Sequence, residues 1–294
     1  MNVAPWAALA LAIHVLGGCA SGPSPSIRTT APNGQSEQIP ATTSKPDGPG
    51  PFPAVVIMHD CSGLGPRSSG APGRWAKELV GRGYVVILPD SFTTRGHADG
   101  VCTTSSTRGV DVSAERRARD AYAALGHLRT LAYVDGRRVG LMGGSHGGTT
   151  TLAAMRAPAG DFEPLVADKR AGFSAAVALY PRCLGRTGAA RGDAAGVYRP
   201  VAPVLILIGD KDDWTPAADC RALADAAQRA GESVAIEVYP GAHHSFDSRN
   251  PVRYVPERIN PSSPTGRGAT TGGHADAWTR SIQDVTTFFG RYLR

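Results

Sequence analysis

Short apolar runs alternate with helical patterns along most of this chain, and that alternation restricts the folds open to it. The runs with the character of buried strands are residues 54–58, 84–88, 139–142, 175–179, 204–208 and 235–239. Apolar strands separated by helices are typical of βαβ units, which build a mostly parallel sheet that is buried on both faces. We therefore expect an α/β fold whose central sheet is flanked by helices on both faces.

Two helical stretches are clearest. One is expected to begin near Asp111 or Ser113 as its N-cap. Its apolar face is Ala121, Leu125, Leu128 and Ala132. The other closes the chain, with apolar residues at helical spacing in Ile282, Val285, Phe288 and Tyr292. We interpret both stripes as faces that pack on the core.

The length and the net charge of the chain limit its domain organisation and the kinds of partner it can bind. A chain of 294 residues fits one α/β domain with an N-terminal extension. The formal net charge of +6 comes from Lys and Arg spread along the sequence, without a basic run interleaved with aromatic residues. We interpret the excess as a solvated basic surface and expect no nucleic-acid partner; the sequence leaves the oligomeric state open.

The first residues have the pattern of an export signal. Residues 7–16 are apolar except for His14 and too short to span a bilayer, and an L-G-G-C stretch then ends at Cys19. This resembles the lipobox of bacterial lipoproteins, in which the cysteine is lipidated, although no Lys or Arg precedes the run. We expect a signal peptide over 1–19 and a protein of the periplasm or cell envelope, touching the membrane only through this anchor; an ordinary secretory signal is the alternative.

The segment after the signal, residues 20–53, is rich in Ser, Thr, Pro and Gly, which predicts a tether followed by one or two edge strands. Because an exported chain folds in an oxidising compartment, its cysteines can form disulfides. Beyond Cys19 the chain holds Cys61, Cys102, Cys183 and Cys220. Four cysteines allow three pairings, among which the sequence does not choose, and four free thiols are the alternative.

A G-x-S-x-G pattern places one serine in a special position. Residues 143–147 read G-G-S-H-G, directly after the strand at 139–142 and before a helical run at 149–156. A sharp turn between strand and helix holds the central Ser145 in strained geometry and exposes its hydroxyl, while the glycines remove clashes. This context predicts a nucleophilic serine.

A serine hydroxyl needs a base and an acid that orients the base. Residues 209–216 follow the strand at 204–208 and read G-D-K-D-D-W-T-P, and two histidines, His243 and His244, follow the strand at 235–239. The carboxyl ends of parallel strands meet at one edge of the sheet, so these groups are expected beside Ser145. A metal site at the histidines has no H-E-x-x-H or cysteine pair to support it, so we expect neither metal nor cofactor.

From about Ala54 to the C-terminus these residues resemble the dienelactone hydrolase family of α/β-hydrolases. In that family the acid lies in G-x-x-D with Pro four residues on, which selects Asp212. The family's histidine follows a Y-P-G-A stretch and precedes a small residue and Phe, which selects His244. The resemblance implies an α/β-hydrolase domain over 54–294 with a Ser145, His244 and Asp212 triad.

The nucleophile departs from the family, since the enzymes that give it its name carry Cys at the place of Ser145. Relatives with Ser are similar to general carboxylesterases. We therefore expect a serine hydrolase that cleaves a small carboxylic ester or lactone through an acyl-enzyme. The alternatives are a small-substrate serine peptidase of the prolyl oligopeptidase type and a catalytically silent α/β-hydrolase that binds a partner in the cell envelope.

The resemblance also implies roles for residues around the triad. The oxyanion hole would be the backbone N–H groups of Cys61 and His146. Asp60 occupies the sequence position at which the family has a carboxylate near the nucleophile. Arg95 lies close to the sequence position at which the family has an arginine that binds anionic substrates.

The implied fold favours two disulfide pairs, Cys61 with Cys102 and Cys183 with Cys220, because each pair would lie on loops at one edge of the sheet. Pocket walls are expected from the loops 182–200 and 248–273.

Overall fold

The computed structural model describes residues 26–31, 33–104, 109–156, 172–183 and 196–294. The signal and anchor expected over 1–19, with Cys19, lie outside these residues, as do 184–195 of one expected pocket wall. No helix in the described ranges is both long and apolar enough to cross a membrane.

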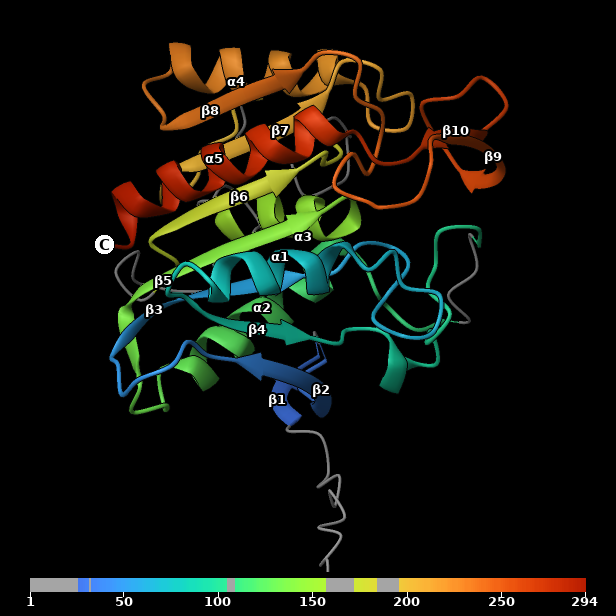
Figure 1. Ribbon diagram of the computed structural model, residues 1–294. Coiled ribbons are helices and arrows are strands. Elements are labelled where there is room, and N and C mark those ends of the chain that lie inside the picture. Colours follow the sequence, from blue (N-terminus) through green and yellow to red (C-terminus); the bar gives the residue numbers. More distant parts are fainter. Residues whose placement is uncertain (1–25, 32, 105–108, 157–171, 184–195) are drawn as a thin grey trace, which may run out of the picture.

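An eight-stranded sheet with the order β1-β2-β4-β3-β5-β6-β7-β8 forms the centre of the molecule (Figure 1). Its strands are β1 (Ser26–Thr30), β2 (Ser36–Ser44), β3 (Phe52–Met58), β4 (Val85–Pro89), β5 (Val134–Gly144), β6 (Ala175–Leu179), β7 (Val204–Gly209) and β8 (Val234–Tyr239). From β4 through β8 all neighbours pair in parallel, whereas β1 and β2 join the edge antiparallel. The predicted α/β-hydrolase fold with a mostly parallel sheet is confirmed.

Helices cover both faces of this sheet. Helices α1 (Ala71–Val80) and α5 (Ala275–Tyr292) lie on the face toward the viewer in Figure 1, while α2 (Ala114–Leu128) and α3 (His146–Met155) lie on the other. Helix α4 (Ala217–Arg229) packs along β7 and β8. Every residue of β6 and β7 is buried, as expected for central strands covered on both sides.

The helices follow the predicted patterns with one correction. The Ser113 side chain caps α2 by accepting a hydrogen bond from the Arg116 N–H, as expected for an N-cap. The helix ends at Leu128, so Ala132 lies in the turn before β5 and not on the helical face. The predicted stripe of α5 packs on the core, with Val285 fully buried and Ile282, Phe288 and Tyr292 partly buried against it. Ser281, Phe289 and Leu293 beside it are fully buried as well.

A hairpin occupies the stretch 248–273, which we expected to be a loop. Strands β9 (Arg253–Ile259) and β10 (Arg267–Thr271) pair antiparallel beyond the carboxyl ends of the parallel strands (Figure 1). The side chain of Asp213 accepts hydrogen bonds from the Thr270 N–H and hydroxyl, both at 2.8 Å. The hairpin is thereby joined to the loop after β7, next to the residues described below.

Candidate active site

Ser145 lies at the sharp turn between β5 and α3. Its backbone has φ 53° and ψ −116°, a left-handed conformation that L side chains rarely adopt. The N–H of Ser145 donates to the Leu179 carbonyl at 2.9 Å. A Cβ on Gly143 would lie 2.3 Å from the Gly147 carbonyl oxygen, and one on Gly147 would lie 2.1 Å from the Met58 oxygen. The two glycines therefore permit the close backbone approach that holds the turn.

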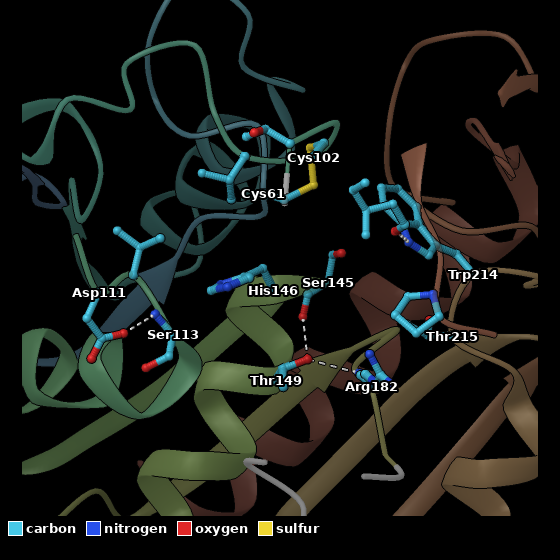
Figure 2. A pocket seen from close by; sticks show the side chains of 15 residues that line it. Cys61, Cys102, Asp111, Ser113, Ser145, His146, Thr149, Arg182, Trp214 and Thr215 are labelled. Carbon is cyan, nitrogen blue, oxygen red and sulfur yellow. Dashed lines mark hydrogen bonds between the residues drawn. A yellow bond between two sulfur atoms is a disulfide. The ribbon is translucent and has the colours of Figure 1, made fainter. Parts of the chain in front are cut away.

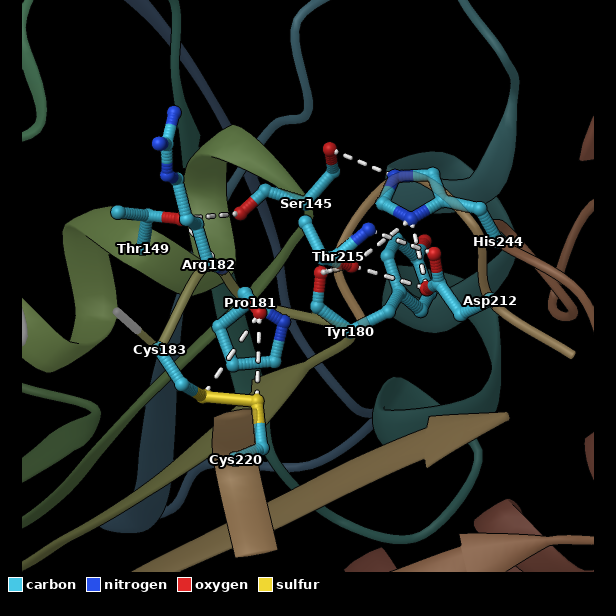
Figure 3. Close-up of a disulfide and its surroundings, with 10 residues drawn as sticks. All are labelled: Ser145, Thr149, Tyr180, Pro181, Arg182, Cys183, Asp212, Thr215, Cys220 and His244. Carbon is cyan, nitrogen blue, oxygen red and sulfur yellow. Dashed lines mark hydrogen bonds and ion pairs between the residues drawn. A yellow bond between two sulfur atoms is a disulfide. The ribbon is translucent and has the colours of Figure 1, made fainter. Parts of the chain in front are cut away.

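Three side chains predicted to act together lie in hydrogen-bond contact (Figure 3). His244 Nε2 is 2.9 Å from the hydroxyl oxygen of Ser145, and His244 Nδ1 is 2.8 Å from a carboxylate oxygen of Asp212. Since a carboxylate oxygen accepts, His244 Nδ1 donates a hydrogen bond to Asp212, which leaves Nε2 to accept one from the Ser145 hydroxyl. This is the geometry that general-base activation of a serine requires.

Only one of the three neighbouring aspartates faces the histidine. Asp212 Oδ1 accepts from the N–H groups of Trp214 at 3.0 Å and Thr215 at 2.8 Å, and Oδ2 lies 2.9 Å from the Thr215 hydroxyl. Asp213 binds the β9–β10 hairpin instead. Asp210 accepts from the Gly241 N–H at 2.7 Å and is exposed. The loop thus fixes the orientation of the Asp212 carboxylate through its own backbone.

Two aromatic side chains enclose the imidazole of His244, which is fully buried. The rings of Tyr180 and Trp214 each have their centroid 4.7 Å from that of His244. The Tyr180 hydroxyl donates to Asp247 Oδ1 at 2.7 Å, and the indole N–H of Trp75 donates to Oδ2 at 2.8 Å. Burial raises the pKa of Asp247 above its usual value. From the sequence, Asp247 is only a possible metal ligand beside the two histidines, and no motif points to Tyr180. The hydrogen bond between them joins the loop after β6 to the loop after β8.

The N–H groups of Cys61 and His146 are available as donors. Both residues line the same pocket as Ser145 (Figure 2), and among the described residues neither N–H has a hydrogen-bond acceptor. Their peptide planes are fixed from behind. The Asp60 carbonyl, which shares a peptide group with the Cys61 N–H, accepts from the His59 ring at 2.8 Å. The Ser145 carbonyl, paired in the same way with the His146 N–H, accepts from the Thr149 N–H at 2.8 Å.

The pocket beside Ser145 has a volume of about 460 Å³. Its apolar walls come from the loop before α2, the loop after β7 and the hairpin, and they include Val101, Val112, Trp214, Ile259 and Pro261. Its polar lining includes Asp111, Ser113, Thr149 and Arg182. Size and mixed lining are those of a small-molecule site.

The structure places Asp60 outside the pocket lining, in the loop that carries Cys61. Asp60 Oδ1 accepts from the Ser62 N–H at 2.7 Å and from the Ser62 hydroxyl, and Oδ2 accepts from the Ser69 hydroxyl. The carboxylate is buried and its oxygens face these loop donors. Asp60, a candidate for substrate binding by the resemblance, therefore has its carboxylate hydrogen-bonded within the loop, and a contact with substrate stays a prediction.

Arg95 is also placed elsewhere than the resemblance implied. Its Nε donates to Glu37 at 3.0 Å, and its two terminal nitrogens donate to Glu37, to Asp120 and to the Ser91 carbonyl. A guanidinium has five N–H groups, and all five are directed at these acceptors. Arg95 does not line the pocket, and no donor remains to hold a substrate anion there. This arrangement gives no support to its expected role in holding an anionic substrate, which stays a prediction.

Both expected disulfides form. Cys61 is bonded to Cys102, and Cys183 to Cys220 (Figures 2 and 3). The first holds the loop that offers the Cys61 N–H, whose carbonyl also accepts from the Val101 N–H at 2.7 Å. The second joins the loop after β6 to α4, below the triad. Two disulfides are typical of proteins that fold outside the reducing cytoplasm, which agrees with the predicted export.

The described residues bring no three His, Cys, Asp or Glu side chains into a metal-binding group. His243, one of the histidines weighed as a ligand, has its Nδ1 3.0 Å from the Lys211 carbonyl oxygen.

The sequence model of the dienelactone hydrolase family matches residues 39–293. The chain is 28% identical over 216 residues to the "Putative carboxymethylenebutenolidase" of Methylorubrum extorquens, covering 71% of this chain and 68% of that protein. It is 27% identical over 218 residues to the "Probable 2-oxo-3-(5-oxofuran-2-ylidene)propanoate lactonase" of a Bradyrhizobium species, covering 73% of this chain and 80% of that protein.

Among solved structures, Thermogutta terrifontis esterase 2 phosphoramylated by tabun is similar with a TM-score of 0.60 and 18% identity, covering 90% of this chain and 94% of that one. At this identity the likeness shows the fold. The family match spans most of the sequence, from β2 to the end of α5. The chain therefore belongs to the dienelactone hydrolase family.

Proposed function

We propose that this hydrolase cleaves carboxylic esters or lactones through an acyl-enzyme on Ser145. One observation carries the proposal: the hydrogen-bonded series from Ser145 through His244 to Asp212 stands at a strained turn, beside two N–H groups that have no acceptor in the described part of the chain. Nucleophile, base, orienting acid and oxyanion donors are the parts that acyl transfer needs.

In the proposed reaction, the Ser145 oxygen attacks the ester carbonyl while His244 Nε2 takes the hydroxyl proton. The N–H groups of Cys61 and His146 donate to the oxyanion that develops on the carbonyl oxygen. The protonated His244, stabilised by Asp212, then gives its proton to the leaving alkoxide. Water enters, loses a proton to His244 and attacks the acyl carbon, which releases the acid and restores Ser145.

The pocket favours a small substrate with an apolar part. Its volume of about 460 Å³ and the walls formed by Trp214, Ile259 and Val101 fit a short acyl or aromatic ester or a lactone ring. The names of the two relatives reported above make lactones a class to test first.

A panel of substrates tests the proposal. Esters of graded acyl length, dienelactone and aminoacyl amides are assayed with the wild type and with Ser145→Ala. Hydrolysis of esters or lactones that is lost in Ser145→Ala supports the proposal. Faster cleavage of amides than of esters would instead identify a peptidase of the prolyl oligopeptidase type. No turnover of any substrate, together with saturable binding of a partner or ligand, would identify a silent binding protein.

We also propose that the protein is exported as a lipoprotein, with 1–19 as signal, Cys19 as the lipidated residue, 20–53 as tether and edge strand segment, and 54–294 as the catalytic domain. The disulfides support an oxidising compartment. Membrane fractionation of the wild type and Cys19→Ala, followed by mass determination of the mature N-terminus, tests this. An unmodified N-terminus at another residue would instead indicate an ordinary secretory signal.

A further inference from the structure

A buried arginine lies between the two segments that donate the N–H groups of the proposed oxyanion hole. Arg117, on α2, is fully buried. One terminal nitrogen donates to the His59 carbonyl at 2.6 Å, and the other donates to Nδ1 of the His146 ring. His59 lies two residues before Cys61, and His146 is itself the other donor. A single rigid guanidinium therefore links both halves of the hole.

The buried charge of Arg117 is not part of an ion pair in the described part of the chain. No carboxylate among the described residues forms an ion pair with it, and its Nε has no hydrogen-bond partner there. The carbon of its guanidinium lies 4.8 Å from the centroid of the Phe92 ring. The nearby Asp120 carboxylate is already bound by Arg95 and Arg116. A buried charge without a paired counter-charge destabilises a folded chain, so a compensating role at a functional site is expected.

The two histidines next to Arg117 are held neutral. Burial and the charge of Arg117 lower the pKa of His146 to about 3, and they lower the pKa of His59 well below its usual value. Since the guanidinium only donates, His146 Nδ1 is an acceptor and its ring proton sits on Nε2. The His59 ring accepts from the Ser91 N–H at Nε2 and therefore donates from Nδ1 to the Asp60 carbonyl, the other end of the Cys61 peptide group.

We propose that Arg117 is a positioning residue of the oxyanion hole, which fixes its two donor segments relative to each other and adds a buried positive charge next to them. The inference rests on the proposed function. The carboxylates of Asp120, Asp60 and Asp90 stabilise the charge of Arg117 through space, but none of them forms an ion pair with it among the described residues. The negative charge that develops on the substrate oxygen in the transition state adds a further charge of opposite sign near this guanidinium. Arg117 thus acts on the transition state more than on the bound substrate, and its loss should lower kcat and leave KM nearly unchanged.

The chain offers a matched control in the preceding residue. Arg116 is also buried on α2, but among the described residues its guanidinium binds Glu37 at 2.6 Å and Asp120 at 3.0 Å and not the histidines of the hole. Arg116→Met therefore removes a buried guanidinium of the same helix without touching the hole. Arg117→Lys keeps the positive charge and loses the pair of guanidinium hydrogen bonds to His59 and His146.

The experiment measures kcat and KM with an activated ester for the wild type, Arg117→Met, Arg117→Lys and Arg116→Met, each corrected for folded protein by circular dichroism. We expect kcat to fall about 100-fold in Arg117→Met, as on loss of an oxyanion donor, with KM within about threefold of wild type. Arg117→Lys should recover part of the loss, and Arg116→Met should lower the Tm while its folded fraction keeps the wild-type kcat. If Arg117→Met does not fold, Arg117→Lys against Arg116→Lys decides in the same way.

Nitrogen-15 NMR of the His146 ring gives a readout that a purely structural role would not move. The wild type should show the neutral tautomer protonated at Nε2, and Arg117→Met should lose that preference. Equal kcat values in Arg117→Met and Arg116→Met, or an Nδ1–H tautomer in the wild type, would overturn the inference while leaving the proposed function intact. A wild type that hydrolyses no ester would overturn both.

Discussion

Two polar regions of the molecule differ in whether their charged and hydrogen-bonding groups are paired within the protein. Under the edge strands, Glu37, Arg95, Arg116 and Asp120 bind one another through buried or partly buried ion pairs. At the carboxyl ends of the strands, the triad residues are hydrogen-bonded to one another. The N–H groups of Cys61 and His146 have no acceptor among the described residues. The first region is closed and holds the fold, whereas the second is open toward a ligand.

In the open region, kcat should depend on Asp212 and not on the neighbouring Asp210. Asp212→Asn keeps the size of the side chain and removes the charge that orients His244, so we expect kcat to fall about 10⁴-fold with little change in Tm. Asp210→Asn, two residues earlier and exposed, is the control and should leave kcat within about threefold of wild type. Steady-state kinetics of both variants decide; a severe loss in Asp210→Asn with a mild one in Asp212→Asn would reverse the assignment.

The closed region should respond in stability and not in chemistry. Arg95→Met leaves Asp120, which is fully buried, with one ion-pair partner fewer, and we expect a loss of about 3–5 kcal/mol in the free energy of unfolding. The kcat of the folded fraction should stay at the wild-type value for neutral and anionic esters alike. A selective rise in KM for anionic esters, measured alongside urea unfolding, would show that Arg95 does hold the substrate.

The two disulfides should differ in how much their loss lowers catalysis. Cys102→Ala and Cys220→Ala each open one crosslink, with sequence separations of 41 and 37 residues, and each should lower the free energy of unfolding by about 2–4 kcal/mol. Only Cys102→Ala frees the loop that offers the Cys61 N–H, so it should lower kcat more than Cys220→Ala does. Reduction of the wild type, verified by thiol titration, should lower activity too. Unchanged kinetics after that reduction would contradict a role for this loop in catalysis.

The smallest expected effect is the pH dependence of the unfolding free energy that Glu37 contributes in the closed region. Burial alone would raise the pKa of Glu37, but hydrogen bonds and charges from Arg95 and Arg116 outweigh it and lower the pKa below 4.5. A lowered carboxylate pKa contributes stability that is present above 4.5 and is lost as the pH falls through the folded-state value. The difference in unfolding free energy between wild type and Glu37→Gln should therefore shrink below that pH. A difference that grows on acidification would contradict the ion pairs.

Local pattern and order along the chain predicted much of this molecule, because buried parallel strands are short apolar runs and their carboxyl ends meet at one edge. The triad and both disulfide pairs followed from that order together with the family resemblance. The partners of Arg95 did not, since Glu37 lies 58 residues away on an antiparallel edge strand. The β9–β10 hairpin was missed because Pro256, Gly266 and Gly268 interrupt its strand pattern. Tyr180 carries no local signal, and the pattern around Asp247 suggested a metal ligand and not its hydrogen bond to Tyr180.

The most direct test of the account is covalent capture of the nucleophile. The folded wild-type protein is treated with a fluorophosphonate, digested, and the modified peptide is identified by mass spectrometry, with Ser145→Ala treated in parallel. The account predicts one adduct on Ser145, loss of ester hydrolysis in proportion to labelling, and no labelling of the variant. Labelling at another residue, or hydrolysis that persists in fully labelled protein, would contradict it.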